Sequence, residues 1–88
     1  HRPELFFYRD SNGNEVDLVL RKDRRLIPVE IKSAATYTDA FLKGIKRFSE
    51  AVGERCSGGI VLYNGPNEHR VNDIRIFNPL LHGGLARL

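Results

Sequence analysis

Asp17, Glu30 and Lys32 are the residues of this sequence whose types and spacing are best suited to chemistry. Together they form the pattern Asp, then Glu-x-Lys. Mg²⁺ in proteins takes oxygen ligands, usually one or two carboxylates together with water and substrate phosphate. A lysine beside such carboxylates could hold a phosphate oxygen, orient the attacking water or stabilise charge in a transition state. The three residues therefore predict a cation site, provided that the fold brings them together.

The hairpin that carries these residues has a register that follows from its turn. Residues 15–21 and 26–32 read as two strands that flank a polar four-residue turn. With this turn, Asp17 faces Glu30, and directly opposed residues have Cβ atoms about 5 Å apart. Two carboxylates so placed repel each other unless something positive lies between them. A divalent cation fits that demand.

An exposed hairpin face would produce the same pattern without any function. Such faces collect charges, and Glu15 opposite Lys32 would then be an ordinary cross-strand ion pair worth under about 1 kcal/mol. The like-charge pair of Asp17 and Glu30 has no compensation in that interpretation. The same face also carries apolar residues, unlike a plain solvated surface: Val19, Leu26 and Pro28. Both interpretations remain open from the residues alone.

The elements that position these residues are expected in the order β-β-β-α-β-β. Alternating or continuous apolar residues predict strands at 5–8, 15–21, 26–32, 60–63 and 71–77. Asn12-Gly13 is the turn signal between the first two strands. In the second strand, alternation places Val16 on the face opposite Asp17 and Val19. The passage from the third strand to the fourth is a crossover, which should be parallel. The fold class is therefore α+β, with a mixed sheet and one main helix.

The main helix follows the third strand. Thr36 to Asp39 matches the Ser/Thr-x-x-Asp/Glu start signal, and Gly53 is placed to end the helix. Five apolar residues recur at helical spacing and predict its buried stripe: Phe41, Leu42, Ile45, Phe48 and Val52. Three basic residues lie mainly off this stripe and are candidate nucleic-acid contacts, although a solvated helix face would look the same: Lys43, Lys46 and Arg47.

Composition limits the partners and the compartment. The 88 residues suffice for one small domain, and the excess of 14 basic over 11 acidic residues is compatible with a polyanionic partner. The single cysteine, Cys56, excludes an internal disulfide framework and fits a reducing, cytoplasmic compartment. No apolar run approaches the roughly 18 residues that span a bilayer, so no membrane partner is expected. Because the sequence contains no Met, we expect a piece of a longer chain.

Several short motifs resemble those of the PD-(D/E)XK nuclease superfamily. Its pattern D…(D/E)-x-K on a β-hairpin matches Asp17 followed by Pro-Val-Glu-Ile-Lys-Ser at 28–33. More closely, residues 8–17, 28–33 and the run Phe-Leu-Lys-Gly at 41–44 resemble the uncharacterised C-terminal domain of prokaryotic AAA-type ATPases. This resemblance covers roughly the first half of the chain clearly and the remainder by element order.

The resemblance implies a single nuclease-like domain over residues 1–88, with a restriction-endonuclease-like core that hydrolyses DNA. By matching position, Asp17 and Glu30 would bind Mg²⁺ or Mn²⁺. The carbonyl of Ile31 would supply a further ligand, and Lys32 would assist hydrolysis. The superfamily places a helix before the first strand, often with an acid that completes the metal site. That helix and the ATPase domain would lie upstream of His1, and this piece alone would then be inactive.

Two further functions fit the same sequence. A non-catalytic module of this fold would serve as a nucleic-acid or protein contact attached to an ATPase. A dimerisation unit, which would form a homo-oligomer, would use the leucine-bearing tail that begins at Asn78 and includes Leu80 and Leu81. The chain has no GxxxxGK[ST] motif, so ATP binding is not expected within it.

Overall fold

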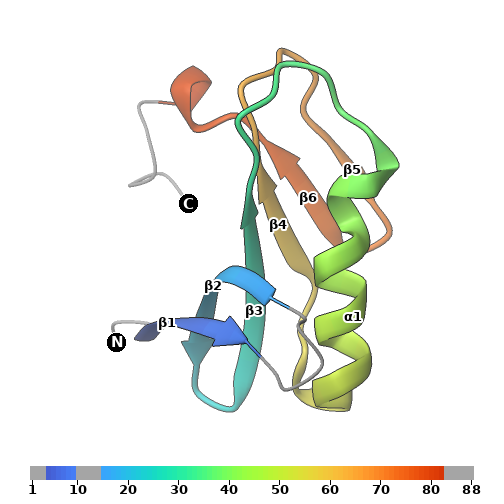
Figure 1. Cartoon of the computed structure of the whole chain (residues 1–88). Helices are drawn as coiled ribbons and strands as arrows, with labels where there is room; N and C mark the ends of the chain where they lie inside the picture. The colour runs from blue at the N-terminus through green and yellow to red at the C-terminus, as the bar shows by residue number, and fades with distance from the viewer. Residues whose placement is uncertain (1–3, 10–14, 83–88) are drawn as a thin grey trace.

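The computed structural model describes residues 4–9 and 15–82, which form a mixed sheet with one α-helix against one face (Figure 1). Helix α1 spans Lys43–Val52, and the sheet has six strands in the order β1-β2-β3-β4-β6-β5. The strands are β1 (Glu4–Arg9), β2 (Glu15–Lys22), β3 (Arg25–Ile31), β4 (Gly59–Leu62), β5 (His69–Val71) and β6 (Ile74–Phe77). The short 3-10 helices are η1 (Asp39–Leu42), η2 (Gly53–Arg55) and η3 (Pro79–His82). The predicted α+β class is confirmed.

The sheet combines an antiparallel meander with a parallel centre. Strands β1, β2 and β3 pair antiparallel, whereas β4 pairs parallel with both β3 and β6. The crossover from β3 to β4 runs through α1, as predicted. No helix within the described ranges is long and apolar enough to cross a membrane. The predicted Asn12-Gly13 turn lies outside the described residues.

The register of the β2–β3 hairpin agrees with the prediction over its paired residues, which end one pair short of Asp17 and Glu30. The ladder runs from Leu18 opposite Val29 to Lys22 opposite Arg25. The turn itself is shorter than expected, because Lys22 and Arg25 pair with each other. Only Asp23, with φ 58°, and Arg24 remain between the strands. Adding one facing pair at the turn does not change which of the other residues face each other, so the register is the predicted one.

The predicted alternation along β2 is wrong at Val16. Val16 and Val19 both pack in the cluster that contains Phe48 of α1, although strict alternation would place them on opposite faces. The β1–β2 pairing explains the difference: Phe6 faces Val19, but Tyr8 faces Val16. Strand β2 therefore has one more residue than β1 in this interval. Such a bulge rotates the end of the strand and turns Val16 toward the helix.

The predicted helix start at Thr36 is also wrong. The 3-10 helix η1 begins at Asp39, and α1 follows only from Lys43. Thr38 occupies the N-cap position of η1 but makes no side-chain cap hydrogen bond. The predicted end is confirmed, because Gly53 follows α1 with φ 66°, a conformation that glycine adopts without strain.

The predicted strand 71–77 is a hairpin, which adds a strand to the expected element order. Strands β5 and β6 pair antiparallel on either side of Asn72 and Asp73. Asn72 has φ 54°, and asparagine tolerates this left-handed conformation better than most residues. Asp73 therefore lies in a turn and not on a strand face.

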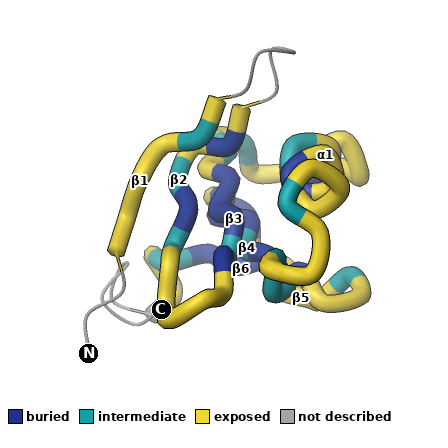
Figure 2. The backbone as a smooth tube through the Cα atoms, turned by 90° about the horizontal axis from the view of Figure 1, so that it is seen from below, coloured by how far each residue is buried: buried dark blue, intermediate teal, exposed yellow. Residues whose placement is uncertain are grey.

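The core lies on both faces of the sheet, and α1 covers only one of them (Figures 1 and 2). The predicted helical stripe is confirmed, because Leu42, Ile45 and Phe48 are buried and Phe41 and Val52 are partly buried. The residues that α1 packs against come from β2, β3, β4 and β6 and their ends: Val16, Val19, Leu26, Val61, Tyr63, Ile74 and Ile76. The opposite face has a smaller cluster: Val29, Leu62 and Phe77, with Leu18, Leu20 and Ile60 partly buried.

Candidate metal-binding site at the open end of the β2–β3 hairpin

Asp17, Glu30 and Lys32 meet at the end of the hairpin that lies away from its turn. Asp17 belongs to β2, Glu30 to β3, and Lys32 directly follows β3. The Asp17 Oδ2 accepts a hydrogen bond from the Ile31 N–H at 2.7 Å. The Lys32 Nζ lies 3.8 Å from the Glu30 Oε2. The structure thus brings the three predicted residues together.

Glu30 is buried beneath the first turn of α1. Only 6% of the residue is exposed, which is unusual for a carboxylate. Gly44 lies directly over it, and a Cβ at that position would overlap the Glu30 Oε1. The same Cβ would lie 3.2 Å from the Glu15 carbonyl oxygen. The helix can therefore approach the hairpin this closely only because residue 44 has no side chain.

The environment of Glu30 favours its protonated form. The pKa of Glu30 is raised from 4.5 to about 7. Burial is the largest cause, and the negative charge of Asp17 and a side-chain hydrogen bond to Asp17 add to it. Lys32 opposes this shift, because its positive charge lowers the pKa of Glu30. Near neutral pH, Glu30 therefore readily holds a proton beside the Asp17 carboxyl group. A divalent cation bound between them would replace that proton and favour both charged forms.

The donor set suits a hard cation. Within residues 4–9 and 15–82, no three His, Cys, Asp or Glu side chains are placed together to hold a metal. A structural zinc site would need four such ligands. Mg²⁺ and Mn²⁺, by contrast, need only one or two carboxylates when water and a substrate phosphate complete the shell. Asp17 and Glu30 fit this second kind of site, and the Ile31 carbonyl remains a predicted ligand.

The alternative ion pair between Glu15 and Lys32 is not formed. Glu15 pairs with Arg9 across β1 and β2, with 2.9 Å between the Arg9 Nη2 and the Glu15 Oε1. The carboxylate nearest to Lys32 is that of Glu30. Lys32 is therefore directed at the buried acid.

Two residues of the site were missed from the sequence, Phe41 and Gly44. The Lys32 Nζ lies 6.0 Å from the centroid of the Phe41 ring, so η1 supplies an aromatic wall beside the ammonium group. Gly44 was visible as a glycine inside a helical pattern, where it costs about 1 kcal/mol relative to alanine. Such a glycine indicates a close approach, but its partner follows only from the packing.

The three predicted nucleic-acid contacts lie on α1. Lys43, Lys46 and Arg47 are all exposed, as expected from their position off the buried stripe. They belong to the same helix that covers Glu30. Their role in binding stays a prediction.

A known protein family matches most of this chain. The family described as Domain of unknown function (DUF4143) matches residues 1–82. The chain belongs to this family. No curated protein matches the chain. Because membership of DUF4143 assigns no activity, the function has to be argued from the site.

Replacing Gly44 with alanine tests the close approach of α1 to Glu30. A Gly→Ala change inside a helix normally stabilises the protein by about 1 kcal/mol. Here we expect Gly44→Ala to lower the free energy of unfolding by about 1–3 kcal/mol, because the new methyl group overlaps the Glu30 carboxylate. Urea unfolding measures the change. In a Glu30→Ala background the loss should shrink, and an equal loss in both backgrounds would contradict the contact.

The raised pKa of Glu30 predicts a dependence of stability on pH. The pKa is about 7 in the folded state, against 4.5 ordinarily, so folding favours the protonated acid. The stability that this raised pKa contributes is fully present below about pH 4.5 and is lost as the pH rises through 7. The Glu30→Gln variant cannot ionise at this position. The difference in unfolding free energy, variant minus native protein, should therefore increase from pH 5 to pH 8. Urea unfolding across this range checks it, and parallel curves would refute the assignment.

Proposed function

We propose that this chain is a metal-dependent nuclease domain that hydrolyses phosphodiester bonds in DNA. The observation that carries the proposal is the buried Glu30, with a pKa of about 7, beside Asp17 and 3.8 Å from the Lys32 ammonium group. A structural ion pair alone gives no reason to place two carboxyl groups in contact. The arrangement also agrees with the resemblance of this hairpin to the PD-(D/E)XK superfamily.

Each residue of the site has a distinct task in this proposal. A bound Mg²⁺ or Mn²⁺ would activate water and neutralise the scissile phosphate. Asp17 and Glu30 would hold the cation, and the hydrogen bond from the Ile31 N–H fixes the Asp17 carboxylate at the end of β3. The Lys32 side chain is partly exposed, so its ammonium group can reach a phosphate oxygen that approaches from solvent.

Helix α1 supports binding of a nucleic acid. Lys43, Lys46 and Arg47 are exposed on it, and the chain as a whole carries a net charge of +3. Basic side chains near a nuclease site bind the phosphate backbone without reading its sequence. By resemblance, the domain would form a restriction-endonuclease-like core attached to an AAA-type ATPase in the cytoplasm.

Cleavage assays with the intact protein test the proposal. With Mg²⁺ or Mn²⁺, the protein should cleave plasmid DNA, and Asp17→Asn, Glu30→Gln and Lys32→Ala should each lower the rate about 100-fold or more. Glu15→Gln is the matched control, because this hairpin acid pairs with Arg9 and lies outside the proposed ligand set. Calorimetry should show Mn²⁺ binding lost in the two acid variants and retained in Lys32→Ala. Absence of both cleavage and Mn²⁺ binding would refute the proposal.

A dimerisation unit is a second candidate, supported by two exposed leucines. Leu80 and Leu81 of η3 are 75% and 57% exposed, and large exposed apolar side chains often mark a protein contact. If they form a homodimer, Leu80→Ser together with Leu81→Ser should convert it to monomer in analytical ultracentrifugation, without any effect of metal. A native protein that is already monomeric at the highest concentration tested would exclude this candidate.

A further inference from the structure

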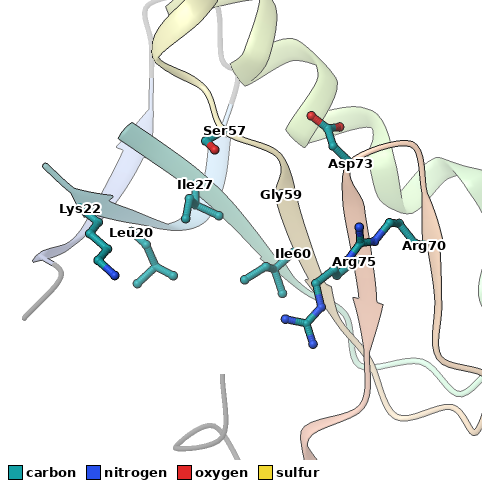
Figure 3. Close-up of a pocket in the computed structure, with 9 residues that line it drawn as sticks. All are labelled: Leu20, Lys22, Ile27, Ser57, Gly59, Ile60, Arg70, Asp73 and Arg75. Carbon is teal, nitrogen blue, oxygen red and sulfur yellow. The ribbon is translucent and has the colours of Figure 1, made fainter. Parts of the chain in front are cut away.

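A groove of about 430 Å³ lies on the sheet face that α1 leaves uncovered (Figure 3). Its floor is apolar and comes from three strands: Leu20 of β2, Ile27 of β3 and Ile60 of β4. Leu20 and Ile27 are direct partners in the β2–β3 ladder, so their side chains share this face. The groove lies nearer to the turn of that hairpin than Asp17, which sits toward its open end, and so differs from the candidate metal site.

Three basic side chains border the floor. Lys22 lies on one side of it, and Arg70 and Arg75 lie on the other (Figure 3). Arg70 and Arg75 face each other directly in the β5–β6 ladder. Directly opposed residues of an antiparallel pair have Cβ atoms about 5 Å apart, and like charges at that position destabilise the pair. An anion between the two guanidinium groups would remove this repulsion.

Two acids lie nearby, Asp73 and Glu68, and Glu68 lines a neighbouring pocket together with both arginines. None of the ion pairs found among the described residues involves Lys22, Arg70 or Arg75. Asp73 also borders the groove, but Figure 3 shows its carboxylate directed away from both guanidinium groups. The Arg75 guanidinium instead lies 5.2 Å from the centroid of the Phe77 ring, which holds it on this face.

We propose that this basic groove binds an acidic peptide segment of a partner protein. Carboxylates of the segment pair with Arg70 and Arg75 on one side and with Lys22 on the other. An apolar side chain of the same segment covers the floor formed by Leu20 and Ile60. Arginine suits this role because its planar guanidinium group binds a carboxylate through two parallel hydrogen bonds.

The apolar floor favours a peptide over a nucleic acid. A phosphate backbone would satisfy the three cations but would leave the exposed parts of the apolar floor uncovered. None of the described residues that line the groove is aromatic, so these residues offer bases no ring on which to stack. A peptide can supply carboxylates and an apolar side chain within a few residues.

Fluorescence anisotropy with the intact protein tests the proposal. The probe is a fluorescein-labelled ten-residue peptide of alternating glutamate and leucine. We expect it to bind, and we expect Arg70→Gln together with Arg75→Gln to weaken binding about tenfold or more. The matched control is Arg24→Gln together with Arg55→Gln, which removes the same charge from exposed residues outside the groove and should change affinity less than about twofold. Replacing the leucines of the probe with serine should also weaken binding.

A charge-reversed variant separates loss of the groove from loss of the fold. Arg70→Glu together with Arg75→Glu should bind a lysine–leucine peptide in place of the glutamate–leucine peptide, which an unfolded protein would not do. The proposal fails if the glutamate–leucine peptide does not bind, or if both double glutamine variants weaken it equally. It also fails if a single-stranded oligonucleotide binds more tightly than the glutamate–leucine peptide and loses that affinity in the variant with Arg70→Gln and Arg75→Gln. None of these outcomes depends on nuclease activity.

Discussion

The burial of Glu30 beneath the first turn of α1 constrains the helix, the hairpin and the site together. The carboxyl group can be accommodated there because Gly44 leaves space for it. Once buried beside Asp17, Glu30 has a raised pKa and binds a proton near neutral pH. Moving an acid into such a position opposes folding, so the surrounding core has to offset the cost. Leu42, Ile45 and Phe48, the buried residues of η1 and α1, supply much of the apolar contact that does so.

The same packing separates the two faces of the sheet. On the face covered by α1, the helix buries Glu30, whereas Asp17 remains exposed at the open end of the hairpin. On the other face, a smaller cluster around Val29, Leu62 and Phe77 leaves a groove that the basic residues of β2, β5 and β6 border. The acidic site therefore lies under the helix at one end of the hairpin, and the basic groove lies across the sheet nearer the other end.

Much of the fold could be predicted from local pattern, and the failures have physical causes. The β2–β3 register was predictable because a hairpin turn determines which residues face each other. The buried stripe of α1 was predictable because helical spacing is regular. Val16 was misplaced because the bulge depends on how β1 pairs with β2. The β5–β6 turn was missed because Asn72 and Asp73 interrupt a run of alternating residues without a glycine or proline.

By itself, the sequence determined that Asp17, Glu30 and Lys32 belong to one hairpin and that an amphipathic helix follows it. Both are local properties, set by residues close together in the chain. Only the tertiary structure decided that Glu30 is buried, that its pKa is about 7, that Gly44 lies against it and that Phe41 lies beside Lys32. It also decided that Arg70 faces Arg75 across an apolar floor assembled from distant strands. Burial and charge environment depend on contacts between segments far apart in sequence, and no local pattern encodes them.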